Sequence, residues 1–304
     1  MKFSIIIPSR NDTERLPATI QSIVDTQLHA NAIEFVIVDD HSEKPISQSD
    51  LKLPSHIELT LIRNKQQEGV PRSRNIGAYQ ASGDIFVMTD SHVTFTHGWD
   101  ATILANISDE NILAGTIADT KSKFKGFGCK LVVPFMGTHW NRMEPIGKRA
   151  VHVASCAATV LKKETFFHIG GYDNGMIIYG AAEPEFSLRA WLSGKEIICQ
   201  PEFIVTHEFK TKPQREKFIS LNRPFMVHNN LRFGFLYLSE NASLEMIRHF
   251  AMLFPDQIEE AIQLVENSDV WERKEQLQKE LKYDFNWFIN KFNLKDQKER
   301  EIKK

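Results

Sequence analysis

The sequence predicts an α/β protein with a mostly parallel central sheet flanked by helices, and with a helical extension at its C-terminal end. Three observations support this prediction. In the first ninety residues, short apolar runs alternate with segments whose apolar residues recur at helical spacing. The runs are apolar throughout, which is typical of parallel strands that helices cover on both faces. From about residue 244 onward, only helical spacing is found.

Each element of the first ninety residues is predicted from one of these two patterns. The strands are expected at residues 3–7, 34–38, 57–62 and 84–89, and the helices at 16–24 and 72–81. Ligands of such sheets bind at the carboxyl ends of the strands. The candidate binding segments are therefore PSRN at 8–11, DDHS at 39–42 and DSH at 90–92.

The middle of the chain is less regular. Apolar runs at residues 112–117, 131–135, 154–161 and 203–209 are expected to form further strands. A helix is expected to begin at EPE, residues 183–185, because proline and acidic residues favour a first helical turn. The basic stretch 210–217 contains Pro213 and is predicted to be a mobile loop.

We divide the chain into two units, residues 1–241 and a helical extension of residues 242–304. The extension carries an apolar stripe formed by Leu277, Leu281, Phe285, Phe288 and Phe292. Such a stripe is buried against another surface in most proteins. We therefore expect the extension either to dock on the first unit or to pair two protomers as a homodimer.

Composition and charge restrict the class of protein. The 304 residues are 42 % hydrophobic and 25 % charged, as in ordinary globular proteins. The net charge of −2 gives no field to attract nucleic acid or an anionic membrane. No apolar run approaches the roughly 20 residues of a membrane span, and no signal-peptide pattern follows Met1. Three cysteines without CxxC spacing argue against disulfides. We expect a cytoplasmic protein without an integral membrane segment or a nucleic-acid partner.

Two side chains that can bind metal follow the strand predicted at residues 84–89. Asp90 and His92 are two positions apart, and in extended backbone such residues point to the same side. An oxygen and an imidazole nitrogen suit manganese, with zinc and iron as alternatives. His207 follows another predicted strand and is a further candidate. The plainer interpretation is a turn cap for Asp90, a surface position for His92 and a structural role for His207.

Charged residues near the other strand ends also have two interpretations. Arg72 and Arg74 lie where a helix begins, a position suited to phosphate binding, or they are solvated surface residues. Asp39 and Asp40 could accept hydrogen bonds from a ribose or a base, or cap a helix. Glu183 is either an ordinary first-turn acid or a general base, since a carboxylate at a helix N-terminus stays ionised near neutral pH.

The sequence lacks the motifs that define several enzyme classes. No GxGxxG follows the first predicted strand, and GxxxxGKS, GxSxG and HExxH are not found. The sequence therefore disfavours a nicotinamide dehydrogenase, a kinase, a serine hydrolase and a zincin.

Taken together, the motifs resemble the GT-A glycosyltransferases of the family 2 type, over about residues 3–235 and in that family's order. The segment IIIPSRN at 5–11 resembles the family's first strand and the turn around the uridine, and VDDHS at 38–42 resembles its VDDxS string. The segment GVPRSRNIGA at 69–78 resembles its GxxxARNxG helix, and GDIFVMTD at 83–90 resembles its GDxxxxxD strand. The resemblance implies a GT-A fold and a UDP-sugar donor. The donor-binding residues that it implies are Ser9, Asp39, Asp40, Arg72, Arg74 and Asp90.

The metal motif narrows the resemblance. DSH at 90–92 is the DxH form of the polypeptide N-acetylgalactosaminyltransferases, in which a histidine after a later strand is the third ligand, and VTHEF at 205–209 is similar to that segment. HGW at 97–99, GYD at 171–173 and EFSLRAW at 185–191 also resemble segments of those enzymes. The resemblance implies Mn²⁺ or Mg²⁺ held by Asp90, His92 and His207.

One segment departs from those enzymes. Alignment on ExSxR places Ala182 where they have Glu and Glu183 where they have Asn. Inverting family 2 enzymes have their base, usually Asp, at that second position. We therefore expect an inverting reaction with Glu183 as the catalytic base, while a retaining reaction stays open.

The resemblance thus implies a metal-dependent hexosyl- or N-acetylhexosaminyltransferase that moves a sugar from a UDP-sugar to an acceptor hydroxyl or thiol. The acceptor is expected to be a peptide or protein, with a polysaccharide or lipid-linked glycan as the alternative. Because Ala182 departs from the family pattern, a non-catalytic nucleotide-sugar-binding module is a second hypothesis. A nucleotidyltransferase is disfavoured, since no glycine-rich, lysine-containing loop follows the first predicted strand.

Overall fold

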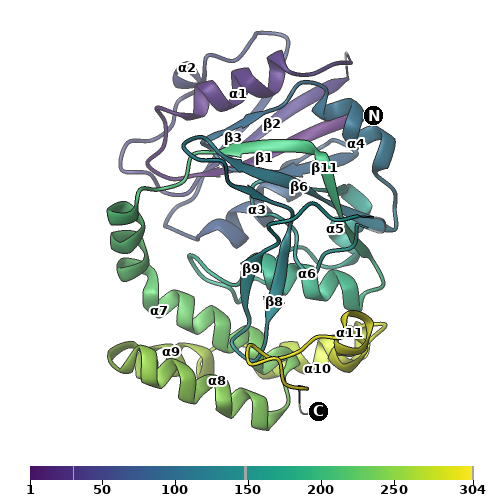
Figure 1. Cartoon of the computed structure of the whole chain (residues 1–304). Helices are drawn as coiled ribbons and strands as arrows, with labels where there is room; N and C mark the ends of the chain where they lie inside the picture. Colours follow the sequence, from purple (N-terminus) through teal and green to yellow (C-terminus); the bar gives the residue numbers. More distant parts are fainter. Residues whose placement is uncertain (30, 147–148, 303–304) are drawn as a thin grey trace.

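A sheet of nine strands lies at the centre of the part of the chain that this computed structural model describes, residues 1–29, 31–146 and 149–302 (Figure 1). The strand order is β3-β2-β1-β4-β10-β6-β11-β5, with β7 beside β6. The first half of this order is parallel, and the second half is mixed.

The parallel half follows the predicted alternation of strands and helices. Its elements are β1 (Lys2–Ser9), α1 (Leu16–Asp25), β2 (Ala32–Asp39), α2 (Gln48–Leu51), β3 (Glu58–Arg63), α3 (Val70–Gln80) and β4 (Ile85–Met88). Helix α3 begins two residues earlier than expected, because Pro71 occupies its first turn, where no backbone N–H is needed.

Buried side chains of the central strand β1 point alternately to the two faces of the sheet. Ile5 and Ile7 belong to one apolar cluster together with Ile20 of α1. Ile6 belongs to the other cluster together with Ala78 of α3. This alternation is the period-2 geometry of a strand, and it explains why β1 is apolar at successive positions.

The mixed half brings the late strand β11 beside the segment that follows β4. Its elements are β5 (Val93–Phe95), α4 (Trp99–Asn106), β6 (Asn111–Asp119), β7 (Lys125–Gly126), β10 (Thr159–Lys162), α5 (Lys163–His168), α6 (Ala182–Leu192) and β11 (Glu196–His207). Strand β11 pairs parallel with β6 and antiparallel with β5, so that His207 lies opposite Val93. Strands β8 (Cys129–Val132) and β9 (Gly137–Trp140) form a separate hairpin.

The prediction of a mobile loop at residues 210–217 was wrong, because most of this segment belongs to helix α7 (Lys212–Tyr237). Thr211 and Gln214 form a capping box at the start of this helix. Pro213 lies in the first turn, where proline is favoured, so it marks a helix start rather than a loop.

Four further helices follow α7 in the described part of the chain and pack on α7 and α6. They are α8 (Glu240–Leu253), α9 (Pro255–Glu266), α10 (Val270–Glu280) and α11 (Phe285–Phe292), and Figure 1 shows them gathered at one end of the molecule. Phe288 and Leu277 of the apolar stripe are buried in the same cluster as Ile6 of β1, so the extension docks on the first unit. The predicted boundary at residue 241 falls in the first turn of α8, and the division into two domains stays a prediction. Residues 303–304 of the second unit lie outside the described residues.

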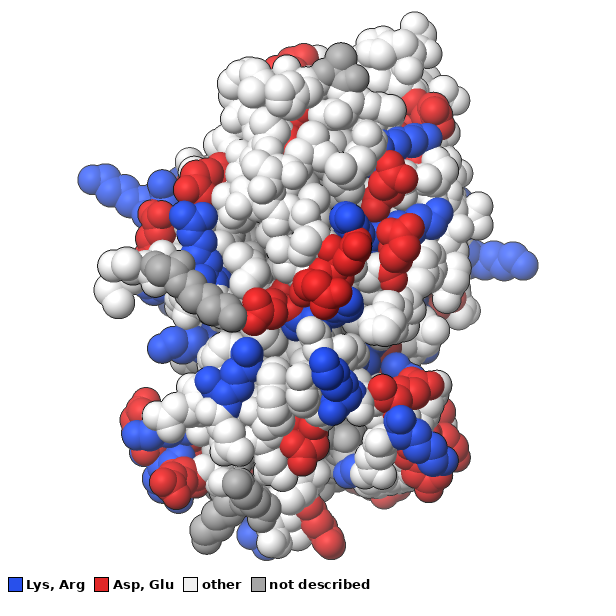
Figure 2. All heavy atoms as spheres, turned by 90° about the vertical axis from the view of Figure 1, so that its right-hand side faces the viewer, with Lys and Arg blue, Asp and Glu red and all other residues white. Residues whose placement is uncertain are grey.

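No helix in the described part of the chain combines the length and the apolar character that crossing a membrane requires. On the face drawn in Figure 2, acidic and basic side chains are interspersed over the middle and lower parts of the molecule. This face therefore presents no broad field of one sign, in keeping with a net charge of −2.

Candidate active site

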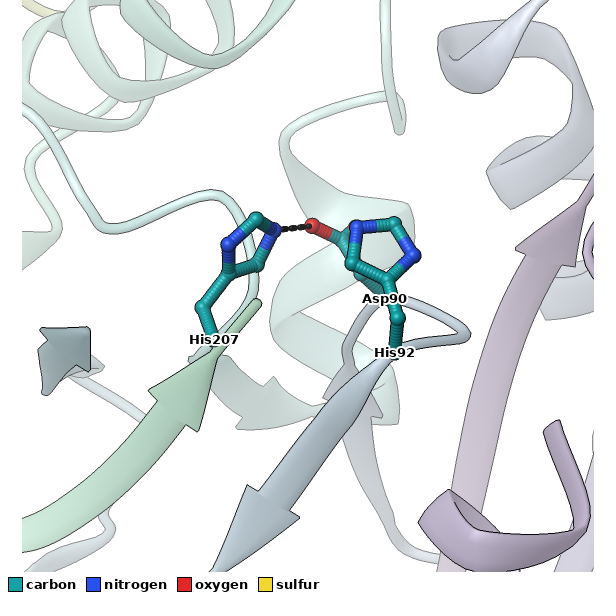
Figure 3. Close-up of side chains that lie close together, drawn as sticks. All are labelled: Asp90, His92 and His207. Carbon is teal, nitrogen blue, oxygen red and sulfur yellow. Dashed lines mark ion pairs between the residues drawn. The ribbon is translucent and has the colours of Figure 1, made fainter. Parts of the chain in front are cut away.

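Asp90, His92 and His207 converge at the carboxyl ends of β4 and β11 (Figure 3). One ligand atom from each of the three lies within 4.8 Å of the others, and Nε2 of His207 is 3.4 Å from Oδ2 of Asp90. The backbone bends at Ser91 and His92, between β4 and β5, and does not continue the extended strand expected from the sequence. The convergence instead depends on this bend and on the pairing of β11 with β5.

The three side chains fit a divalent cation. Each is mostly buried, with 13 to 22 % of the side chain exposed, so a bound ion would keep an open side. Burial opposes ionisation of Asp90, but the hydrogen bond from His207 and the positive charge of Arg74 outweigh it and hold the pKa well below its usual value. An anionic oxygen with two imidazoles is a donor set that suits manganese.

Asp12 supports the cluster and was missed in the sequence analysis. Its Oδ2 lies 2.8 Å from Nδ1 of His92 and accepts a hydrogen bond from the Ser91 hydroxyl, while Arg15 pairs with its other oxygen. A carboxylate on one ring nitrogen fixes the orientation of a histidine and leaves the other nitrogen for a metal. Asp12 follows the PSRN segment directly, so extending that strand-end segment by one residue would have found it.

A buried arginine joins the predicted base to the metal cluster. Arg74 has no exposed side-chain surface. Its Nη1 donates to Oε1 of Glu183 at 2.6 Å and to the Tyr172 hydroxyl at 3.2 Å, and its Nη2 donates to the Cys156 carbonyl and to Asp90 Oδ1 at 3.3 Å. Glu183 lies in the first turn of α6 with 22 % of its side chain exposed. One guanidinium therefore holds two carboxylates that are far apart in the sequence.

The other predicted donor ligands occupy different positions. Arg72 pairs with Glu68 and donates to the Asn174 carbonyl at 2.8 Å, so these contacts do not include the Asp90 cluster. Ser9 ends β1, and its hydroxyl is buried without a hydrogen-bond partner among the described residues. A buried hydroxyl in this state has the capacity to bind a ligand group.

The carboxylates of Asp39 and Asp40 are buried and organise the neighbouring loops. Asp39 accepts backbone N–H groups of Ser42 and Ile46 and pairs with Arg63. Asp40 binds the Asn64 side chain and accepts the backbone N–H groups of Glu68 and Gly69. Both residues thus shape the binding edge of the sheet, and their direct contact with a nucleotide stays a prediction.

Comparison with known proteins identifies the family. The model of the family described as "Glycosyl transferase family 2" matches residues 4–157, about half of the chain. The chain belongs to glycosyl transferase family 2. This result confirms the resemblance seen in the sequence motifs.

Curated relatives of this family 2 chain have names from one group of enzymes. Polypeptide N-acetylgalactosaminyltransferase 4 of Mus musculus is 29 % identical over 94 % of this chain and 50 % of its own length. Probable N-acetylgalactosaminyltransferase 9 of Caenorhabditis elegans is 31 % identical over 63 % of this chain and 37 % of its own length. Inactive polypeptide N-acetylgalactosaminyltransferase-like protein 5 of Macaca fascicularis is 29 % identical over 78 % of this chain and 57 % of its own length. The chain spans about half the length of the curated relatives it matches.

Solved structures confirm the predicted GT-A fold of this family 2 chain. The crystal structure of GalNAc-T7 with UDP, GalNAc and Mn²⁺ superposes with a TM-score of 0.75 at 19 % identity, over 96 % of this chain and 56 % of that one. The structure of S. aureus TarS 1-349 with UDP-GlcNAc gives a TM-score of 0.52 at 14 % identity, over 88 % of this chain and 91 % of that one.

Proposed function

We propose that this chain is a metal-dependent glycosyltransferase that transfers a sugar from a UDP-sugar to a hydroxyl or thiol of a peptide or protein. The convergence of Asp90, His92 and His207 at the sheet edge, with Glu183 linked to them through Arg74, is the observation that supports it most. The name of the Mus musculus relative, polypeptide N-acetylgalactosaminyltransferase 4, favours a peptide acceptor. The similar crystal structure of GalNAc-T7 contains UDP and Mn²⁺, which favours this donor and this ion.

The residues of the site divide the chemistry between them. Asp90, His92 and His207 would hold Mn²⁺ or Mg²⁺, which neutralises charge on a diphosphate leaving group when bound. Glu183 accepts the proton of the acceptor group, and its exposed edge makes it reachable from solvent. Arg74 fixes the direction of the Glu183 carboxylate through a 2.6 Å hydrogen bond. This arrangement favours an inverting reaction, in which the base acts on the face of the sugar opposite the leaving group.

Turnover tests the proposal directly. The chain is incubated with Mn²⁺ and a panel of UDP-sugars, with and without a mixed peptide acceptor, and released UDP is measured. We expect turnover with at least one donor, a loss of about 10²- to 10⁴-fold in kcat for Glu183→Gln, and a product of inverted anomeric configuration by NMR. Glu185→Gln is a poor control because Glu185 is buried in an ion pair, so the exposed Glu164→Gln serves instead.

Donor binding without turnover across the panel would favour the non-catalytic module, a possibility that the inactive relative makes concrete. Turnover only with a polysaccharide or lipid-linked acceptor would move the proposal to the alternative acceptor class. A retained anomeric configuration would remove Glu183 from the role of base. Homodimerisation through the C-terminal helices and a cytoplasmic location stay predictions, which light scattering and cell fractionation test.

A further inference from the structure

The loop of residues 173–181 leads directly into Glu183 and has an unusual backbone. Ile178, Gly180 and Ala181 have φ values of 51°, 105° and 57°, in the left-handed region. Glycine adopts this region readily, but a β-branched residue such as Ile178 is strained there. Strained residues of this kind persist only where the surrounding structure determines their conformation. The contacts that hold this loop are therefore informative.

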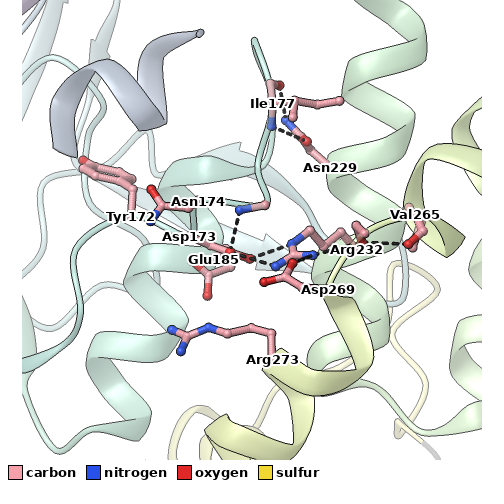
Figure 4. A network of polar contacts seen from close by, with 12 residues as sticks. Tyr172, Asp173, Asn174, Ile177, Glu185, Asn229, Arg232, Val265, Asp269 and Arg273 are labelled. Atoms are coloured by element: carbon pink, nitrogen blue, oxygen red, sulfur yellow. Dashed lines mark hydrogen bonds and ion pairs between the residues drawn. The ribbon is translucent and has the colours of Figure 1, made fainter. Parts of the chain in front are cut away.

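Asn229 of α7 holds the loop from one side. Its amide nitrogen lies 2.8 Å from the carbonyl of Ile177, 3.2 Å from that of Tyr179 and 2.9 Å from that of Gly180. Its carbonyl oxygen accepts the backbone N–H of Ile177 at 3.0 Å (Figure 4). Asn229 is completely buried, so water does not substitute for these hydrogen bonds. A single side chain thus binds the backbone on both sides of the strained Ile178.

Arg232 lies one turn further along α7 and holds the start of the loop. Its Nε and Nη2 donate to the two carboxylate oxygens of Asp173 at 2.8 and 2.9 Å, and Asp173 in turn accepts the N–H of Gly175 (Figure 4). A Cβ at Gly175 would lie 1.9 Å from the Arg232 guanidinium carbon, so the loop backbone rests on this side chain. Nη1 of Arg232 pairs with Asp269 at 2.8 Å, next to α10. Helix α7 therefore links the loop to the C-terminal helices.

The start of α3 holds the loop from the opposite side. The N–H of Val70 donates to the carbonyl of Ile178 at 3.1 Å, and Gly69 and Ile178 form an isolated parallel bridge. A Cβ at Gly69 would lie 2.3 Å from Cα of Ile178, so only glycine allows this approach. Helix α3 also carries Arg74. The loop is thus fixed between the helix that supplies Arg74 and the helix that supplies Asn229.

We propose that Asn229 is a positioning residue that fixes the loop of residues 173–181 and thereby sets Glu183 against Arg74. The C-terminal helices then contribute to the site through α7, although they supply none of its predicted ligands. The kinetic consequence of this proposal rests on the proposed glycosyltransferase activity. The structural consequence, a loop ordered by Asn229, does not depend on that activity.

Asn229→Asp tests the proposal, since it keeps the size of the side chain and replaces the donating amide by an oxygen that faces three carbonyls. In hydrogen–deuterium exchange, we expect peptides covering residues 173–181 to exchange about tenfold faster, with β1 to β4 unchanged. We expect kcat to fall by about 10- to 100-fold, while the Kd for UDP with Mn²⁺ changes less than twofold. Asn222→Asp on the same helix is the matched control. Among the described residues, the side chain of Asn222 hydrogen-bonds only to the Phe218 carbonyl, within α7 itself.

Asp269→Asn is a milder variant that leaves the Arg232–Asp173 pair in place, and 65 % of the Asp269 side chain is exposed. It tests the link to the C-terminal helices: we expect about threefold faster exchange of the loop, and unchanged exchange there would overturn that link. If Asn229→Asp does not fold, Asn229→Ser, which shortens the side chain without adding a charge, takes its place with the same expected results. Unchanged loop exchange in a folded Asn229→Asp chain would overturn the positioning role, as would an equal loss in Asn222→Asp. A wild-type chain without turnover would instead contradict the proposed function, while the exchange data still decide the role of Asn229.

Discussion

Arg74 places one positive charge between two carboxylates in a position without contact to water. Removing a guanidinium from water is costly unless its N–H groups find acceptors. Here Glu183, Asp90, Tyr172 and a backbone carbonyl accept from Nη1 and Nη2, while Nε has no partner among the described residues. Burial raises the pKa of Tyr172 to about 12, so its hydroxyl stays neutral and accepts from Arg74. The direction of the predicted base is therefore set by a residue that is shared with the metal cluster.

Asp12 is expected to tune metal affinity through His92. In Asp12→Asn, only one acceptor oxygen remains, and it cannot serve both Arg15 and His92 Nδ1, so the ring loses the charged carboxylate that fixes its orientation. We expect Mn²⁺ affinity to weaken by about 10- to 100-fold, measured by an electron paramagnetic resonance titration without donor or acceptor. Asp25→Asn, an exposed change on α1, is the control with unchanged affinity. Equal affinities in wild type and Asp12→Asn would contradict this role.

At the residue scale, the sequence was informative where side chains that can bind a metal directly follow a strand. Asp90, His92 and His207 were predicted as one cluster, and the structure brings them together. The ion pair of Arg74 with Glu183 joins residues more than a hundred positions apart, and no local pattern indicates such a contact. Arg74 was expected to bind phosphate, which stays a prediction, and its buried contacts with Glu183 and Asp90 were not foreseen.

At the scale of elements, β2 carries a charge where the sequence predicts only an apolar strand. Glu34 is 4 % exposed and accepts hydrogen bonds from Ser4, Ser82 and Gly83, and it pairs with Lys2 at 2.9 Å. Burial opposes ionisation, but the bonds from Ser4 and Ser82 outweigh it and lower the pKa to about 2. This carboxylate ties the amino ends of β1 and β2 to the turn before β4.

The effect of Glu34 on stability is expected to depend on pH. Because its pKa is lower in the folded chain than in the unfolded one, its contribution is complete above about pH 4.5 and is lost as pH falls through about 2. Glu34→Gln should lower the free energy of unfolding by about 3 kcal/mol at pH 7 and by much less at pH 2.5. Urea unfolding at both pH values measures this. Glu58→Gln is the control, because Glu58 is an exposed partner of the same Lys2. It should lower the free energy of unfolding by less than about 0.5 kcal/mol.

Elements were predictable where one pattern dominated the local sequence. The apolar runs of β1, β2 and β4 gave their positions to within a few residues, because strands covered on both faces are apolar over most of their length. The start of α7 was not predicted, because proline marks both loops and first helical turns. The capping residues on both sides of Pro213 were the local signal for a helix.

At the scale of the whole molecule, the C-terminal helix α11 packs on the segment between β9 and β10. The ring of His152 lies 4.4 Å from that of Phe292 and 5.5 Å from that of Phe288, measured between centroids. Burial, with a smaller contribution from the charge of Lys130, lowers the pKa of His152 to about 4. A neutral imidazole is therefore part of the contact between the extension and the rest of the chain.

This contact is expected to make the docking of α11 sensitive to acid. A lowered pKa means that the unfolded chain binds the proton more tightly, so stability is complete above about pH 6.5 and falls as pH decreases to about 4. The loss attributable to His152 should reach at most about 3 kcal/mol. In His152→Gln, the melting temperature measured by calorimetry should change less between pH 7 and pH 5 than it does in wild type. The exposed His139→Gln should retain the slope of wild type, and an equal flattening there would contradict the assignment.

The order of the strands could not be predicted beyond the parallel half. The sequence indicates each strand separately, but the insertion of β10 between β4 and β6 and the return of β11 to β5 depend on pairings between distant segments. The pairing of β11 with β5 brings His207 to Asp90 and His92.

The pairing of β11 with β5 also has a consequence for folding. Two of the predicted metal ligands lie at 90 and 92 and the third at 207, so a complete set exists only in a chain whose sheet has closed as far as β11. A cation that binds all three adds stability to that closed topology and none to chains with a slipped or missing last strand. Binding of an ion there would thus favour correctly folded molecules over those whose last strand is misplaced.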